Sequence, residues 1–148
     1  MTTIVIRPAT EADLPALLAL YAELHADDPP LPPEAAASLW RAIASQAGRT
    51  VLLATLDERT VGTVDCLVAP NLTRGGRPFM LLENVVVAAA ARRGGVGTSL
   101  VRAAVDVARA AGCYKVQLLS RADRVTAHAF YESCGFRPTA QGYRTYLN

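Results

Sequence analysis

The sequence predicts one mixed α/β domain in which a β-sheet is flanked by helices. In the first half, β-type runs are separated by a short polar turn, so the early strands should form a hairpin. In the second half, β-type runs alternate with helical patterns, so the late strands should be joined by helices. The chain has 148 residues, of which 51% are hydrophobic and 19% are charged. This is the size and composition of a single domain over residues 1–148 with a sizeable core.

The first half of the chain is expected to contain three strands and two helices. In chain order these are a strand at 4–6, a helix from Thr10 to about His25, a helix over 34–47, and strands over 50–54 and 61–68. Thr10 is a good N-cap because its side chain can accept a hydrogen bond from a free amide. The prolines between Asp27 and Pro33 should end the first helix, since proline removes a backbone donor and restricts φ.

The second half is expected to alternate strands and helices. In chain order these are a strand over 80–87, a helix over 96–111, a strand over 114–119, a helix over 125–134 and a final strand over 144–147. The first of these runs is almost continuously apolar, which indicates a strand covered on both faces. The longer helix has a polar stripe of Arg102, Asp106 and Arg109, so its opposite side is left for the core.

Composition and charge exclude several classes of protein. The net charge of +2 suits an anionic small molecule better than nucleic acid, which would require a basic stripe. The three cysteines are widely separated and form no Cys/His cluster, so we expect neither a disulfide framework nor a metal site. No run reaches the ~20 apolar residues of a membrane span, and the N-terminus lacks the pattern of a signal peptide. We therefore expect a cytoplasmic protein with no membrane partner.

A glycine-rich segment lies between the apolar strand and the long helix. It consists of Arg92, Arg93, Gly94, Gly95, Val96, Gly97 and Thr98. Glycines allow the backbone to turn sharply and to approach a ligand closely. The first amides of a helix are unpaired and lie at the positive end of its dipole, which favours an anion. The two arginines add charge-assisted donors that suit phosphate oxygens.

Two nucleotide-binding patterns fit this segment poorly. A Walker A loop requires a lysine after its last glycine, and Gly97 is followed by Thr98. A dinucleotide fingerprint requires a third glycine where this chain has Leu100. From spacing alone, two interpretations remain open: a site for another phosphate-containing ligand, and a glycine-rich helix start with no ligand.

Three motifs in order resemble the GNAT superfamily of N-acetyltransferases. The pattern Arg92-x-x-Gly95-x-Gly97 resembles the Arg/Gln-x-x-Gly-x-Gly/Ala signature of that family. The strand 82–87 before it is typical of the family, and the segment 127–136 resembles its late FYE-x-x-GF motif. The resemblance covers nearly the whole chain. It implies a mixed, mostly antiparallel sheet of about six or seven strands flanked by about four helices.

A narrower resemblance concerns the glucosamine-6-phosphate N-acetyltransferases. The segments 112–116 and 130–136, and the run Glu-Asn-Val-Val-Val at 83–87, are similar to theirs. The similarity weakens after Leu118, where those enzymes are more acidic.

The family resemblance implies that acetyl-CoA is the co-substrate and that no metal takes part. The pyrophosphate would lie on the amides of the glycine-rich segment, with Thr98 in the first turn of the helix. The pantetheine arm would run along the preceding strand like an additional strand. The implied contacts are Val85, Val86, Val87, Phe130 and all seven residues from Arg92 to Thr98.

Three residues are candidates for catalytic roles, and the resemblance places one of them, Tyr131, near the thioester sulfur. Tyr131 is the candidate general acid, because a phenol stays protonated near pH 7 and can donate to the leaving thiolate; the alternative is a core aromatic. Glu83 is the candidate base, because a carboxylate in an apolar strand is costly to bury unless it is paired or lines a groove; the alternative is a structural hydrogen bond. Asn84 could orient the amine or the oxygen of the intermediate, and it stands where related enzymes often have an acid. A route through Cys66 or Cys134 is the less favoured mechanism.

The predicted reaction is direct attack of a small-molecule amine on acetyl-CoA within a ternary complex. The alternative is a non-catalytic CoA-binding sensor or assembly module. Asp27 and Asp28 suit a cationic acceptor, whereas Arg121 and Arg124 suit a phosphate of the substrate or of CoA, or are solvated loop charges. Members of the family often dimerise, so a homodimer is expected, although no sequence feature defines its surface.

Overall fold

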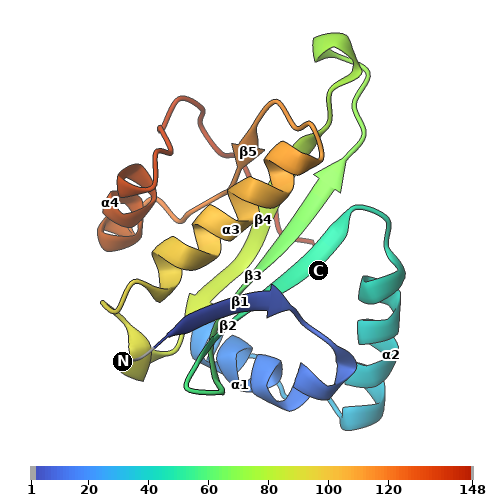
Figure 1. Cartoon of the computed structure of the whole chain (residues 1–148), viewed down its shortest axis with the longest axis vertical. Helices are drawn as coiled ribbons and strands as arrows, with labels where there is room; N and C mark the ends of the chain where they lie inside the picture. Colours follow the sequence, from blue (N-terminus) through green and yellow to red (C-terminus); the bar gives the residue numbers. More distant parts are fainter. Residues whose placement is uncertain (1–2, 148) are drawn as a thin grey trace.

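A twisted sheet of five strands organises residues 3–147, the part of the chain that the computed structural model describes (Figure 1). The strands are β1 (Ile4–Pro8), β2 (Arg49–Leu56), β3 (Arg59–Ala69), β4 (Phe79–Val87) and β5 (Val116–Gln117). Their order in the sheet is their order in the chain. The pairs β1–β2, β2–β3 and β3–β4 are antiparallel, and β4–β5 is parallel. The expected mixed, mostly antiparallel α/β fold is confirmed.

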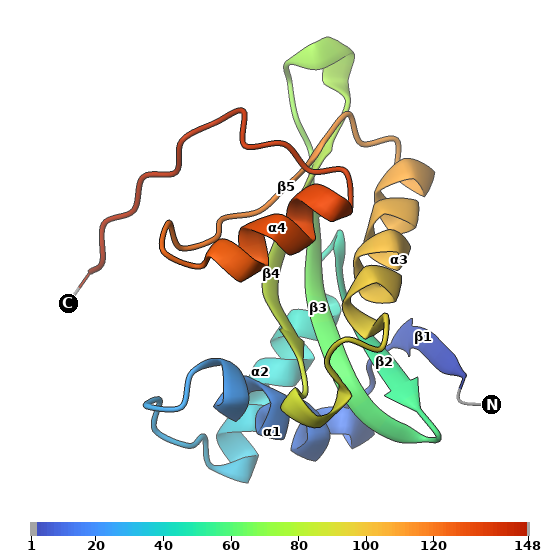
Figure 2. The same cartoon turned by 90° about the vertical axis from the view of Figure 1, so that its left-hand side faces the viewer.

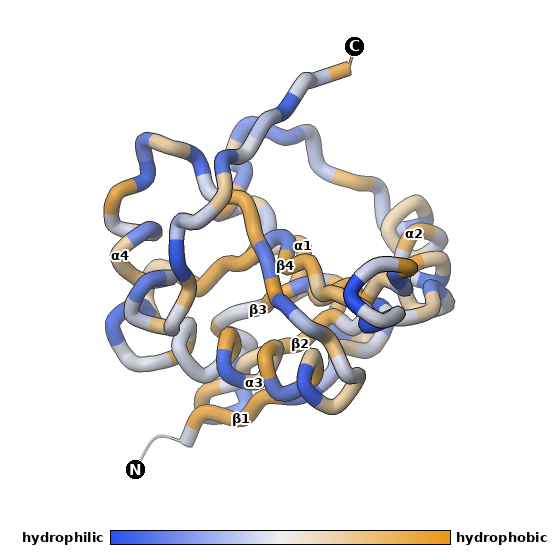
Figure 3. The backbone as a smooth tube through the Cα atoms, turned by 90° about the horizontal axis from the view of Figure 1, so that it is seen from above, coloured by the Kyte–Doolittle hydropathy of each residue, from blue (hydrophilic) through white to orange (hydrophobic). Residues whose placement is uncertain are grey.

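Helices lie on both faces of this sheet. The α-helices of the described residues are α1 (Leu14–Leu24), α2 (Pro33–Ser45), α3 (Val96–Ala110) and α4 (Val125–Ser133). Seen from above, the strands β2, β3 and β4 run between α3 on one side and the pair α1 and α2 on the other (Figure 3). In the view of Figure 2, the helix α4 lies in front of β4 and β5.

The sheet is apolar on both faces because alternate residues of its strands enter two different clusters. On the α3 face, the buried residues include Leu52, Val64, Cys66, Leu82, Leu100 and Ala104. On the α1 and α2 face, they are Leu17, Trp40, Val51 and Leu53. Close packing of α3 requires Gly62 in β3, since a Cβ there would lie 2.9 Å from Leu100 Cδ1. The polar stripe of α3 faces solvent as its sequence pattern predicts.

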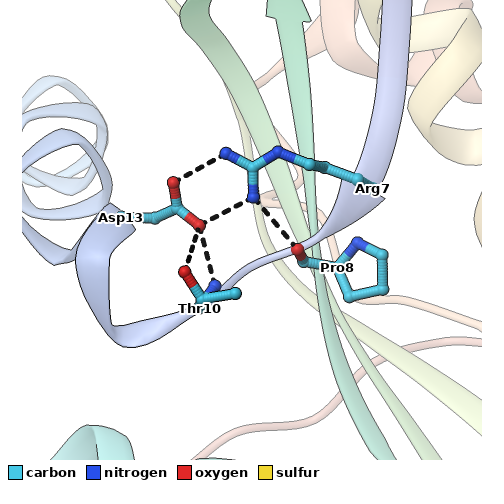
Figure 4. A network of polar contacts seen from close by, with 4 residues as sticks. All are labelled: Arg7, Pro8, Thr10 and Asp13. Atoms are coloured by element: carbon cyan, nitrogen blue, oxygen red, sulfur yellow. Dashed lines mark hydrogen bonds and ion pairs between the residues drawn. The ribbon is translucent and has the colours of Figure 1, made fainter.

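The start of α1 is fixed by an ionic network (Figure 4). Both Nη atoms of Arg7 donate to the Asp13 carboxylate at 2.8 Å. The same carboxylate accepts from the Thr10 backbone amide at 2.7 Å. The hydrogen bonds from Arg7 hold the pKa of Asp13 well below its usual range. The expected helix over residues 10–25 therefore begins with a short 3-10 turn, Glu11–Asp13, before α1.

The expected final strand over 144–147 is wrong. Residues after Gly135 form no helix or strand up to residue 147, and they run away from the sheet (Figure 2). Tyr143, Tyr146 and Leu147 are 83%, 80% and 90% exposed. The strand expected over 114–119 shrinks to Val116–Gln117. A segment forms a strand only where it pairs with the edge of another strand. No segment pairs with the free edge of β5, so the described residues contain five strands rather than six or seven.

Candidate active site

The strands β4 and β5 pair over only two positions and then separate. Pairing joins Met80 to Val116 and Leu81 to Gln117. Beyond Leu81, no strand of the described residues pairs with this edge of β4. A β-bulge at Asn84, which has a φ of 51°, shifts the register between β3 and β4. Because a bulge bends its strand, β4 turns from β5 and its edge can pair with an extended ligand.

The N-terminus of α3 follows β4 after residues 88–95, which include a short 3-10 turn, Ala89–Ala91. Its N-cap is Gly95, which has a left-handed φ of 85°. A Cβ at Gly95 would meet its nearest neighbour, Ile4 Cδ1, only at 4.0 Å, so the space before the helix is open. No side chain caps the helix and its first turn contains no acid. The amides of Val96, Gly97 and Thr98 are therefore able to bind an anion.

The glycine at position 97 has a packing role. A Cβ there would lie 3.0 Å from Phe130 Cζ and 3.7 Å from Val87 Cγ2. The ring of Phe130 thus brings α4 against the first turn of α3 and the end of β4. Three of the predicted cofactor contacts, Val87, Gly97 and Phe130, are close together in the structure.

The other predicted cofactor residues lie around this point. The Arg92 Nε donates to the carbonyl of Val87 at 3.2 Å, which ties the glycine-rich segment to the end of β4. Arg93 and Gly94 are exposed. Val86 is only 5% exposed, so its side chain belongs to the core and only its backbone could touch a ligand. The side chain of Val85 packs against the α3 core.

The candidate general acid, Tyr131, lies in an aromatic cluster. Its ring centroid is 5.2 Å from that of Phe130 and 6.1 Å from that of Phe136. Burial raises the pKa of the Tyr131 phenol, and the nearby Arg124 opposes this shift more weakly. A raised pKa keeps the phenol protonated, as donation to a thiolate requires. The packing is also that of a core aromatic, so the role of Tyr131 as general acid stays a prediction.

A cavity of about 130 Å³ lies between the sheet and the pair α1 and α2. Its polar lining is Tyr21, Arg49, Asp65 and Asn84. Arg49 contacts both carboxylate oxygens of Asp65, from Nε at 3.0 Å and from Nη2 at 2.6 Å. Burial, aided by the Asp65 charge, raises the pKa of Tyr21 to about 12. Asn84 connects this cavity to the bulge of β4.

Sequence reasoning missed the ion pair between Asp65, which is buried, and Arg49, which is half-buried. Glu83, the carboxylate predicted to be paired or to line a groove, is exposed. The carboxylate that is buried and paired is Asp65 in β3, whose side chain is 5% exposed. Arg49, at the start of the neighbouring strand, was the available signal. Glu83 is the register partner of Asp65, so it lies beside the cavity and remains a candidate base.

Several other side chains have ordinary surroundings. Arg121 pairs with Asp123 at 2.9 Å, and both are exposed. His128 Nε2 lies 2.7 Å from the carbonyl of Arg121. Cys66 is 1% exposed, and burial raises the pKa of its thiol to about 12, which opposes a thiolate nucleophile.

Residues 3–147 contain no group of three metal-ligating side chains. None of the helices in this part of the chain is long and apolar enough to cross a membrane.

The chain belongs to the acetyltransferase (GNAT) family, whose model matches residues 16–136. It is 39% identical over 79 residues to a glucosamine 6-phosphate N-acetyltransferase of Trypanosoma brucei brucei, a match that covers 53% of this chain and 52% of that protein. It is 33% identical over 137 residues to an aminoglycoside N(6')-acetyltransferase type 1 of Stenotrophomonas maltophilia, covering 90% and 86%. The matches to two glucosamine 6-phosphate relatives span only about half of their length.

A solved structure shows the same fold. A putative acetyltransferase from Agrobacterium tumefaciens is 41% identical to this chain and superposes with a TM-score of 0.94. The superposition covers 97% of this chain and 99% of that one. The resemblance inferred from the sequence, and the GNAT-like arrangement of sheet and helices, are thus confirmed.

Proposed function

We propose that this protein transfers the acetyl group of acetyl-CoA to a primary amine of a small molecule. The observation that carries the proposal is the uncapped N-terminus of α3 beside the unpaired edge of β4. The helix N-terminus suits a pyrophosphate. The strand edge suits an extended arm that contains amide groups. The relatives named above act, by their names, on amino groups of sugars and aminoglycosides, which supports an amine acceptor.

In this proposal the pyrophosphate lies on the first-turn amides of α3 and the pantetheine arm pairs with the backbone of Val85 and Val87. The Val87 carbonyl already accepts a hydrogen bond from Arg92. Arg92 therefore holds the glycine-rich segment against the end of the β4 edge. The amine, attacking in a ternary complex, forms the C–N bond as the C–S bond breaks. Its proton passes to Glu83, directly or through water, while Asn84 orients the reacting groups. Tyr131 supplies a proton to the departing thiolate.

The alternative is a CoA-binding module without turnover. Two measurements distinguish the acetyltransferase from the CoA-binding module. Calorimetry gives the affinity for acetyl-CoA, and a thiol assay gives the release of CoA in the presence of a panel of primary amines. We expect saturable acetyl-CoA binding and thiol release that at least one amine stimulates. Tight binding with no stimulation by sugar, aminoglycoside, polyamine, amino-acid or simple alkyl amines would favour the module.

We further propose a homodimer. Residues 137–147 carry exposed Tyr143, Tyr146 and Leu147, and β5 pairs on one side only, which supports a second copy as the partner of this segment. Light scattering should give twice the chain mass, and deletion of residues 137–148 should give the monomer mass. A monomer for the intact chain would contradict the proposal. A cytoplasmic location, and the absence of nucleic-acid and membrane partners, stay predictions.

A further inference from the structure

The cavity between the sheet and the pair α1 and α2 is mainly apolar. Its apolar walls include Leu17, Leu39, Trp40, Ile43 and Val51. Its volume of about 130 Å³ is close to that of an apolar cavity of roughly 150 Å³ known to hold benzene. The space therefore suits one aromatic ring or a short branched alkyl chain.

The charged groups of this cavity are already paired. Arg49 and Asp65 are the only charged residues among its described lining. Arg49 donates from Nε and Nη2 to Asp65 and from Nη1 to the side-chain oxygen of Gln46 at 3.0 Å. Both carboxylate oxygens of Asp65 accept from Arg49. The lining thus offers neither an unpaired cation for a phosphate nor an unpaired carboxylate for a second ammonium group.

This pairing decides which acceptors the cavity can favour. A phosphate or an additional ammonium would lose its hydration here without gaining an opposite charge, which is costly. An apolar group gains from leaving water in proportion to the area that it buries. The cavity also reaches Asn84, at the bulge of the strand along which the thioester arm is proposed to lie.

We infer that the acceptor is a monoamine with a compact apolar body. An aryl or short branched alkyl group lies against Trp40 and Ile43, and the amino group points to Asn84 and the neighbouring Glu83. This inference rests on the proposed function and narrows its substrate class. The inferred acceptor differs from the acceptors that the names of the relatives give, which are a phosphorylated amino sugar and an aminoglycoside.

The test uses Trp40, the only tryptophan of the chain, as a reporter that does not depend on turnover. Phenethylamine and isopentylamine are titrated into the protein with saturating CoA, followed by tryptophan fluorescence. We expect saturable changes with both amines. Glucosamine 6-phosphate and spermidine should need concentrations at least 100-fold higher. In thiol-release assays, kcat/KM should follow the same order.

A variant at the mouth of the cavity provides a matched comparison. Leu39 lines the cavity and is 51% exposed, so Leu39→Asp should fold and should weaken phenethylamine binding at least tenfold. Leu72 is fully exposed and lies outside the lining, so Leu72→Asp should leave binding unchanged. Equal affinity in Leu39→Asp and the parent would overturn the placement of the apolar body.

The remaining outcomes separate the inference from the proposed function. If glucosamine 6-phosphate or spermidine is acetylated with a kcat/KM equal to or above that of the apolar amines, the inference fails while the proposed function stands. If the apolar amines bind but no amine stimulates thiol release, the proposed function fails while the cavity's ligand class stands. Absence of both binding and turnover with phenethylamine and isopentylamine overturns the inference.

Discussion

Gly95→Leu is expected to weaken acetyl-CoA binding by at least about 100-fold, the effect of losing two hydrogen bonds to a charged group. Gly95 is the N-cap of α3, and a Cβ there would project into open space with Ile4 Cδ1 at 4.0 Å. This is the space in which we place the pyrophosphate. A leucine side chain would fill it and separate the anion from the amides of Val96 and Gly97.

The left-handed φ of 85° at Gly95 adds strain that must be separated from loss of the ligand. Gly112→Leu is the matched control, because Gly112 has a φ of 79°, also has open space at its Cβ position and lies beyond the other end of α3. Both variants should lose about 1–2 kcal/mol of stability. Calorimetry should show weakened acetyl-CoA binding for Gly95→Leu and parent-like binding for Gly112→Leu. Parent-like affinity in a folded Gly95→Leu protein would remove the proposed pyrophosphate site.

Much of the fold could be predicted because its signals are local in sequence. The stripe of Arg102, Asp106 and Arg109 identified the buried side of α3, since helix periodicity depends on residues within a few turns. The glycine-rich segment indicated a helix start with unpaired amides, because it is also a signal contained in a few neighbouring residues. The family motifs placed these elements in the correct order.

The errors and omissions concern contacts between distant residues. The partner of Asp65 is Arg49, 16 positions away on the neighbouring strand, and no local pattern specifies that pairing. The bulge at Asn84 depends on the register between β3 and β4. The segment 144–147 has the composition of a strand, but whether it forms one depends on an edge with which it can pair. The cavity results from packing α1 and α2 on the sheet, so its apolar character could not be predicted from any one segment.

Tyr131→Phe is expected to lower kcat by roughly 100-fold, the lower end of what a positioned general acid contributes. The KM for acetyl-CoA should change little, because the predicted pyrophosphate and pantetheine contacts are the glycine-rich segment, β4 and the ring of Phe130, and the substitution alters none of them. Phenylalanine keeps the ring that packs with Phe130 and Phe136. The melting temperature should therefore stay near that of the parent, and Tyr143→Phe, at an 83% exposed tyrosine, should leave kcat unchanged.

The pH profile distinguishes a proton donor from a core aromatic at position 131. Because burial raises the pKa of Tyr131 above its usual range, a phenol that donates remains protonated, and therefore active, up to at least about pH 10. The parent should lose kcat only above that pH, whereas Tyr131→Phe should lack this alkaline limb. A variant with parent-like kcat and the same alkaline limb would show that Tyr131 only packs, and that the leaving thiolate is protonated by another group or by water.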